Sequence, residues 1–311
     1  MIEDIQREIE NVNELLKEKY RDFFALPNEK FRIEILSKVG KISSLKKLSE
    51  EELKDFGAVV GVDGSTNRVG GAHPHYIDLF QALAKPTRGE DLYLNECYTP
   101  ILGNLNKDEN FEIENKNKML AQIELDVAIN CIEKQNPSFI MMDGGLVRYI
   151  LEDNDRFKEL VEICEEKEII LIGVIEDTKT NIISRANNLE SSYFDRELLY
   201  GRLNIGECLE VDDAFNNKLE FGISSAFLRT SSFAAAMGMD ILNSQKNYLK
   251  EAANLIYTLT PYNSRGIPLW LDIVDKEVRI TDKLIKSMLE EYLDRDIYER
   301  FFVSERDRRS L

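Results

Sequence analysis

Two aspartates each stand directly after an apolar run and directly before a glycine. Asp63 follows Ala58-Val59-Val60-Gly61-Val62, and Asp143 follows Phe139-Ile140-Met141-Met142. Each apolar run predicts a buried strand. The glycine after each acid predicts a sharp turn and lets a ligand approach the main chain closely. Because carboxylate oxygens are the ligands that hard divalent cations prefer, the two turns indicate a metal site and, with it, phosphate chemistry.

A third acid, Glu124, lies between the two aspartates in a segment whose apolar residues recur at helical spacing. A glutamate within that stripe faces the core or a cleft, where an unpaired carboxylate is costly. A metal ion would satisfy it, and so would a lysine or an arginine. Plainer interpretations stay open: each aspartate can be a turn residue that caps its own backbone, and Glu124 can lie at the edge of the stripe. The apolar residues on its face are Leu120, Val127, Ala128 and Cys131.

Three further residues are candidates on the same chemical grounds. Lys179 follows the apolar run 169–175 and could contact a phosphate as a point charge, although a solvated loop lysine is the plainer interpretation. Asp272 and Asp275 lie in the apolar segment 267–275, where either could complete a metal site or serve as a surface residue or helix cap. The position of each in the fold must decide between these roles.

The composition restricts both the ligands and the compartment. The 311-residue chain holds only two histidines, His73 and His75, which are expected at the surface, so carboxylates must provide any metal ligation. Its four cysteines form no CxxC pair, which is typical of reduced, buried thiols and not of a zinc site. No apolar run is long enough to span a membrane, and residues 1–10 are acidic and polar, unlike a secretory signal. We expect a cytoplasmic protein with no membrane partner.

The charge of the chain argues against simple electrostatic binding of nucleic acid. Its net charge is −17, whereas proteins that coat nucleic acid without specificity are usually basic. A nucleic-acid substrate would therefore need a local basic groove or a partner that delivers it.

The order of the predicted elements places the three acids within one known plan. Three extended segments predict an antiparallel meander, and two helix-linked strands follow it. This is the plan of an RNase H-like domain, in which the first strand, the first helix and the fourth strand each supply an acid. Asp63, Glu124 and Asp143 occupy those three places. The predicted strands are 58–62, 76–84, 91–102, 139–142 and 169–175, and the predicted helices among them are 117–135 and 155–167.

The sequence around these acids resembles the NurA family of nucleases. The resemblance spans residues 50 to 295 and is clearest in VDGS at 62–65, IELDVAI at 123–129 and MMDGGL at 141–146. It implies an α/β fold with an RNase H-like (Piwi-like) mixed central sheet flanked by helices. It also implies a manganese-dependent DNA nuclease, with magnesium as the alternative ion, that has 5′ to 3′ exonuclease and single-strand endonuclease activity.

The resemblance further implies partners and a domain plan. Family members form homodimers and act with a HerA-type hexameric translocase in DNA end resection, and roles in repair and in phage defence are both compatible with that pair. On this basis residues 1–56, which begin with a predicted helix over 2–20, form an N-terminal helical arm. Residues 57–311 form the NurA-like nuclease domain.

Carried onto this chain, the family pattern makes Asp63, Glu124 and Asp143 catalytic metal ligands and gives Lys179 a place after the next strand. Two departures stand out. The second turn is Asp-Gly-Gly, where relatives commonly have Asp-Gly-Ser. Asp275 lies where many relatives have a histidine that is near a tyrosine. That tyrosine has no clear counterpart in this chain, although Tyr262 is close. Aspartate also binds manganese, so Asp275 is predicted as a fourth metal ligand.

Two other function classes compete with the nuclease. Residues 61–68 faintly resemble the first phosphate loop of actin- and hexokinase-like phosphotransferases, but the glycine-rich adenosine motif of that class is missing. The altered residue at 275 is also compatible with a non-catalytic subunit that binds a translocase. Tight ATP binding would favour the first class, and complex formation without metal-dependent cutting would favour the second.

Overall fold

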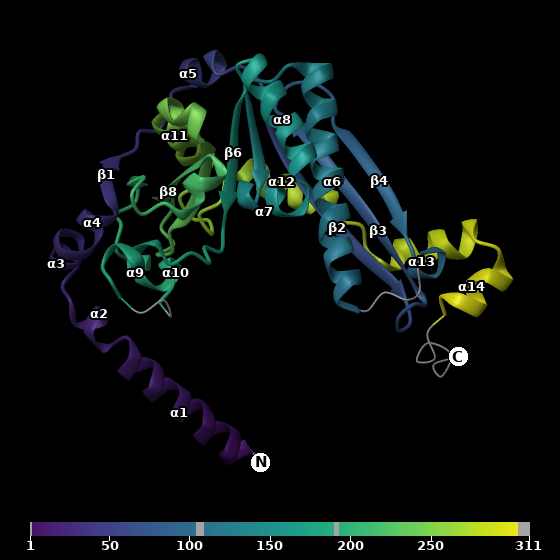
Figure 1. Cartoon of the computed structure of the whole chain (residues 1–311), viewed down its shortest axis with the longest axis horizontal. Coiled ribbons are helices and arrows are strands. Elements are labelled where there is room, and N and C mark those ends of the chain that lie inside the picture. The colour runs from purple at the N-terminus through teal and green to yellow at the C-terminus, as the bar shows by residue number, and fades with distance from the viewer. Residues whose placement is uncertain (1, 104–108, 190–192, 304–311) are drawn as a thin grey trace.

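A mixed β-sheet runs through the whole molecule (Figure 1). The computed structural model describes residues 2–103, 109–189 and 193–303, and in these residues the sheet has nine strands in the order β1-β7-β8-β9-β6-β5-β2-β3-β4. Among these described strands, only the neighbouring pairs β2–β5 and β5–β6 are parallel. The remaining pairs are antiparallel.

One half of the sheet has the predicted strand plan. β2 (Val59–Gly70), β3 (Tyr76–Pro86) and β4 (Leu92–Tyr98) form the antiparallel meander. β5 (Phe139–Asp143) and β6 (Ile170–Ile175) then add in parallel beside β2. The meander and the two helix-linked parallel strands confirm the RNase H-like order that the sequence predicts.

The predicted turn after Val62 is wrong. β2 continues through Asp63 to Gly70, because its hydrogen bonds to β3 persist along the whole strand. Only the pairing with β5 stops, at the pair Val62 and Met142. The second turn is confirmed: β5 ends at Asp143, and Gly144 has a φ of +115°, a conformation that favours glycine.

The other half of the sheet extends the plan beyond the predicted strands. β9 (Met237–Leu242) pairs with β6, and β8 (Ile223–Arg229), β7 (Glu207–Val211) and β1 (Gly40–Ser44) follow outward. β1 brings part of the N-terminal segment into the sheet. The division of the chain at residues 56 and 57 stays a prediction.

Helices cover both faces of the central strands. α6 (Glu109–Gln135), α7 (Leu146–Glu152) and α8 (Asn154–Glu166) cover one face, and α11 (Leu249–Leu259) and α12 (Leu269–Val278) cover the other. The long helix begins eight residues before the predicted start at residue 117.

The two cores follow from the alternation of side chains along each strand. Val60 and Met142 pack with α6, α7 and α8, whereas their neighbours Val59 and Met141 pack with α11 and α12. A third apolar cluster joins β7 and β8 to short helices near the N-terminus. The central strands are therefore buried on both faces, which is typical of parallel strands.

The remaining helices lie at the ends and edges of the sheet. α1 (Ile2–Lys19) confirms the predicted N-terminal helix and extends away from the body (Figure 1). None of the helices in the described ranges has the length and apolarity needed to cross a bilayer. The other helices are α2 (Arg21–Ala25), α3 (Asn28–Phe31), α4 (Ser37–Val39), α5 (Glu50–Asp55), α9 (Ile182–Ala186), α10 (Asp195–Leu199), α13 (Asp282–Tyr292) and α14 (Arg295–Phe301), with a π-helix η1 (Arg32–Leu36) and the 3-10 helices η2 (Pro100–Leu102), η3 (Asn217–Phe221) and η4 (Asn243–Tyr248).

Candidate active site

The parallel pairing of β2 and β5 sets Asp63 and Asp143 side by side. Val62 and Met142 are the last paired residues, so the next residue on each strand is an aspartate. Beyond this point β2 stays bonded only to β3, and β5 turns away at Gly144. The sheet therefore opens where the two carboxylates emerge, and backbone spacing alone brings them within a few ångströms of one another.

Glu124 reaches the same point from α6. Its side chain is buried, with 1% of its surface exposed, as the apolar stripe on its helix predicts. A Cβ atom added to Gly64 would lie only 2.5 Å from Oε1 of Glu124, so the glutamate occupies the space beside the residue after Asp63. Its other oxygen, Oε2, accepts a hydrogen bond of 2.6 Å from the Tyr149 hydroxyl and an ion pair from Arg148.

A fourth carboxylate, Asp275, comes from α12 on the opposite face of the sheet. This helix approaches β2 closely at Gly61, where an added Cβ would lie 3.0 to 3.3 Å from the side chains of α12. The charge of Asp275 raises the pKa of both Asp63 and Asp143. Nη2 of Arg279 donates to Oδ1 of Asp275 at 2.6 Å. The structure thus brings together all four acids that the sequence predicts as ligands.

Concentrated negative charge is the dominant electrostatic feature of this site. Burial first, and then the charges of Asp143 and Glu124, raise the pKa of Asp63 to about 8. Burial and the charge of Asp275 raise the pKa of Asp143 to about 6, against the opposing charge of Arg265. Burial also raises the pKa of Glu124. Carboxylates that resist ionisation in this way would be stabilised by a bound cation.

A lysine or arginine partner was one alternative for Glu124, but the sequence did not identify which positive charges act on these acids. Arg148 acts on Glu124 and Asp143, and Arg265 acts on Asp143. Lys179, the predicted phosphate contact, is exposed in the loop after β6. Arg148 lies on the helix that follows Asp143, five residues along the chain, but no spacing rule links it to an acid on a different helix. Only the fold shows that contact.

Arg265 also distinguishes the two aspartates of α12. Its guanidinium donates to Oδ1 of Asp272 from Nη2 at 2.7 Å and from Nε at 3.0 Å, and Nη1 donates to Oε2 of Glu176 at 2.6 Å. Both aspartates of α12 form an ion pair, Asp272 with Arg265 and Asp275 with Arg279, but Asp275 is the one whose charge raises the pKa of Asp63 and Asp143. The structure favours Asp275 over Asp272 as the fourth carboxylate.

The donor set fits a hard divalent ion. Every candidate ligand is a carboxylate oxygen, the donor that manganese and magnesium prefer. Within the described ranges, no three or more histidine, cysteine, aspartate or glutamate side chains are already gathered tightly enough to hold one ion. Binding would therefore require side-chain rearrangement of these carboxylates.

The fold and the site together define a class. The sheet combines a three-stranded antiparallel meander with two parallel strands, and β2, α6 and β5 each carry one of the acids. This arrangement is that of an RNase H-like protein with a carboxylate-lined edge. The NurA domain family matches residues 57–280 of the chain. The protein therefore belongs to the NurA family.

A solved structure of a NurA protein agrees with this fold. A crystal structure of NurA superposes with a TM-score of 0.57 at 11% sequence identity, covering 94% of this chain and 99% of that one. Endonuclease V from Ciona intestinalis, bound to an inosine-containing DNA, gives a TM-score of 0.45 at 13% identity over 87% of this chain and 99% of that chain. Human endonuclease V gives 0.41 at 13% identity over 84% and 98%. A comparison with curated protein sequences finds no match.

Proposed function

We propose that this member of a nuclease family is a metal-dependent deoxyribonuclease that uses manganese, with magnesium as the alternative. The observation that carries the proposal is the meeting of Asp63, Glu124, Asp143 and Asp275 from four separate elements at the one edge where β2 and β5 part. Family membership supports cleavage of DNA as 5′ to 3′ exonuclease and single-strand endonuclease.

Each side chain has a role in this proposal. Asp63, Asp143, Glu124 and Asp275 would supply the carboxylate oxygens that hold the metal. The bound ion would lower the pKa of a water nucleophile and stabilise the leaving oxygen. Lys179, exposed on the loop after β6, would contact the phosphate of the DNA backbone. Burial of the acids keeps their charge in a low-dielectric setting, where it acts strongly on a cation.

We propose a HerA-type translocase hexamer as the partner that delivers DNA, in end resection for repair or in phage defence. The net charge of −17 supports this, because so acidic a surface attracts DNA weakly. A motor that threads DNA to the carboxylate edge removes the need for a broad basic surface. Cutting that is no faster with the translocase than without it would contradict this coupling.

The unpartnered face of α1 supports the proposed homodimer. Ile2, Ile5, Ile9, Val12 and Leu16 alternate at spacings of three and four residues, as in a coiled-coil seam, and each is more than half exposed. In proteins, most of the stability of a helix comes from packing of its apolar face. It therefore needs a partner for its apolar stripe.

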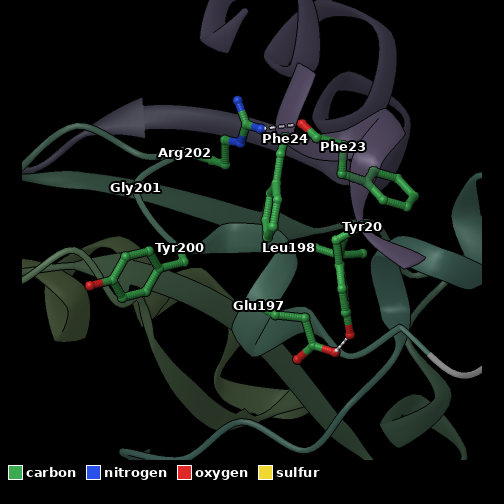
Figure 2. A pocket seen from close by; sticks show the side chains of 8 residues that line it. All are labelled: Tyr20, Phe23, Phe24, Glu197, Leu198, Tyr200, Gly201 and Arg202. Carbon is green, nitrogen blue, oxygen red and sulfur yellow. Dashed lines mark hydrogen bonds between the residues drawn. The ribbon is translucent and has the colours of Figure 1, made fainter. Parts of the chain in front are cut away.

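A second copy of the same helix is the occupant that we propose for this face. In the heptad that these residues define, Gln6 and Asn13 flank the seam on one side, and Glu8 and Leu15 flank it on the other. Only Glu8 is charged, so identical helices meet with little like-charge repulsion. The base of α1 is fixed: Tyr20 donates to Oε1 of Glu197 at 2.6 Å, beside an aromatic pocket of about 270 Å³ (Figure 2).

Sedimentation tests the dimer. We expect the wild-type chain of 35.9 kDa to sediment as a dimer and the Ile9→Glu variant as a monomer. Asn11→Glu adds the same charge on the outer face of α1 and should leave the dimer intact. A wild-type monomer, or a dimer that survives Ile9→Glu, would contradict α1 pairing.

The nuclease is tested by incubating the wild type and Asp63→Asn with end-labelled single- and double-stranded DNA. Manganese, magnesium or EDTA would be present, with and without the translocase. We expect cutting that requires the metal and is lost in Asp63→Asn but kept in Asp55→Asn, which changes an exposed aspartate. Complex formation without metal-dependent cutting by the wild type would instead favour a non-catalytic subunit. Tight ATP binding would favour the phosphotransferase.

A further inference from the structure

The two oxygens of Glu124 have different surroundings. Oε2 is held by two donors from α7: the Tyr149 hydroxyl at 2.6 Å and Nη2 of Arg148. Oε1 lies over Gly64, where an added Cβ would approach it to 2.5 Å. The carboxylate is therefore oriented, with one oxygen engaged by α7 and the other directed to the strand that carries Asp63.

The donors themselves are held in place. The Tyr149 ring is buried and stacks on Phe157, with ring centroids 6.3 Å apart. The Arg148 guanidinium lies over the Tyr149 ring at 4.6 Å. Nε of Arg148 is buried without a hydrogen-bond partner. A polar atom left unpaired in this way is costly, so the bond of Arg148 to Glu124 is made at the expense of its Nε group.

The start of α7 is anchored from a distant strand. No side chain caps α7 at Gly145, but the backbone N–H of Leu146 donates to Oδ2 of Asp240 on β9 at 3.2 Å. Asp240 is fully buried and is paired with Lys218, whose Nζ lies 2.7 and 2.9 Å from its two oxygens. This anchor fixes the helix that follows Asp143 directly. The same helix therefore positions one acid through the chain and another through its side chains.

We infer that Arg148 and Tyr149 are positioning residues that clamp Oε2 of Glu124, so that Oε1 is the oxygen offered to a divalent cation beside Asp63. This deepens the proposed function and rests on it, because it says how one ligand of that same site is presented. Hydrogen-bond partners of metal-ligating carboxylates commonly serve this purpose, and losing one typically lowers metal affinity about 10- to 100-fold.

Calorimetric titration of the apo protein with Mn²⁺ tests the clamp without relying on catalysis. Tyr149→Phe keeps the stacked ring and removes only the hydroxyl, so we expect thermal stability near that of the wild type. Mn²⁺ affinity should fall about 10-fold or more. Arg148→Gln should lower it as well, and Arg148→Lys should restore part of the loss.

A matched control lies on the same helix. The Tyr98 hydroxyl donates to Oε1 of Glu112 at 3.2 Å, and Glu112 is twelve residues, or about 18 Å along α6, from Glu124. Tyr98→Phe also removes a tyrosine–glutamate hydrogen bond, but away from the carboxylates. Its Mn²⁺ affinity should equal that of the wild type. Equal weakening in both tyrosine variants would show a general effect of α6 packing and overturn the clamp.

A double-mutant cycle separates the clamp from the proposed function. In a Glu124→Gln background, Tyr149→Phe should cause no further loss of Mn²⁺ affinity, because the oxygen that it positions is already altered. If the wild type binds no Mn²⁺ at all, the metal-dependent function itself fails. If the wild type binds Mn²⁺ and a well-folded Tyr149→Phe binds it equally well, the function stands and the clamp is refuted.

Discussion

A fully buried aspartate and a pair of partly buried aspartates lie on neighbouring parts of the sheet and are treated in opposite ways. Asp240 on β9 is fully buried, yet both of its oxygens contact Lys218, and the Ser225 hydroxyl donates to it at 2.8 Å. Asp63 and Asp143 are mostly buried and face other carboxylates, so the pKa of each is raised, to about 8 and about 6. Burial does not mark the site by itself. The site is distinguished by several carboxylates that lie close enough to raise one another's pKa.

The comparison separates a structural role from a functional one. A neutralised aspartate such as Asp240 supports the fold, because its charge is matched within the chain. Asp63 and Asp143 lie among other carboxylates, so their ionisation is unfavourable and an added cation would stabilise it. Active sites often hold such destabilising arrangements in exchange for function.

The largest expected effect on stability comes from removing Lys218, the cation that matches the charge of Asp240. Lys218→Met leaves the charge of Asp240 buried and unpaired, and breaking a buried ion pair on one side costs about 3–5 kcal/mol. We expect the free energy of unfolding in urea to fall by that amount. Lys246→Met is the control, because Lys246 pairs with Asp213 in a more exposed ion pair. If Lys218→Met were as stable as the wild type, the contrast between the two groups would be lost.

Gly64 should be the next most sensitive position. An alanine Cβ there would lie 2.5 Å from Oε1 and 2.8 Å from Cγ of Glu124, so the glutamate must move. Overpacking of this kind costs about 1–3 kcal/mol, and we expect Gly64→Ala also to lose most DNA cleavage. Gly103→Ala meets no atom closer than 3.4 Å and should change neither. Full activity in a folded Gly64→Ala protein would place Glu124 outside the site.

Replacing Asp63 should raise the stability of the metal-free protein, whereas the two substitutions above lower it. Its pKa is raised from 3.8 to about 8, so the folded state holds a proton that the unfolded state releases at lower pH. The stability that this group contributes is complete below about pH 4 and is lost as pH rises towards 8. Asp63→Asn should therefore unfold at a higher temperature than the wild type at pH 8 and show a smaller decline between pH 5 and 8. An Asp63→Asn protein that is less stable than the wild type at pH 8 would indicate that a positive charge within the chain compensates Asp63.

Lys179 should show the smallest effect. Its side chain is exposed, and a solvated charge contributes about 0.2–1 kcal/mol. Lys179→Ala should therefore raise the KM for DNA at most about fivefold and leave Mn²⁺ affinity unchanged. Lys167→Ala, another exposed lysine, should alter neither quantity. A large fall in kcat for Lys179→Ala would give this residue a more direct part in the reaction.

The amino-acid sequence by itself determined the features that depend on local pattern. Apolar runs such as 58–62 and 139–142 marked buried strands, because side-chain alternation and β-propensity act over a few residues. The apolar stripe around Glu124 predicted that it points inward, because helical periodicity is equally local. The order of the elements then placed three acids on one RNase H-like plan.

Only the tertiary structure decided the surroundings of those acids. β2 continues past Asp63 because β3 pairs with it, which no residue near Asp63 specifies. Leu146 and Asp240 are 94 residues apart, and Arg265 and Glu176 are 89 apart. Contacts over such separations depend on how the sheet and helices pack together, and a single sequence does not state them. The pattern of residues thus located the carboxylates, whereas packing decided which were matched by a positive charge and which were left to attract a cation.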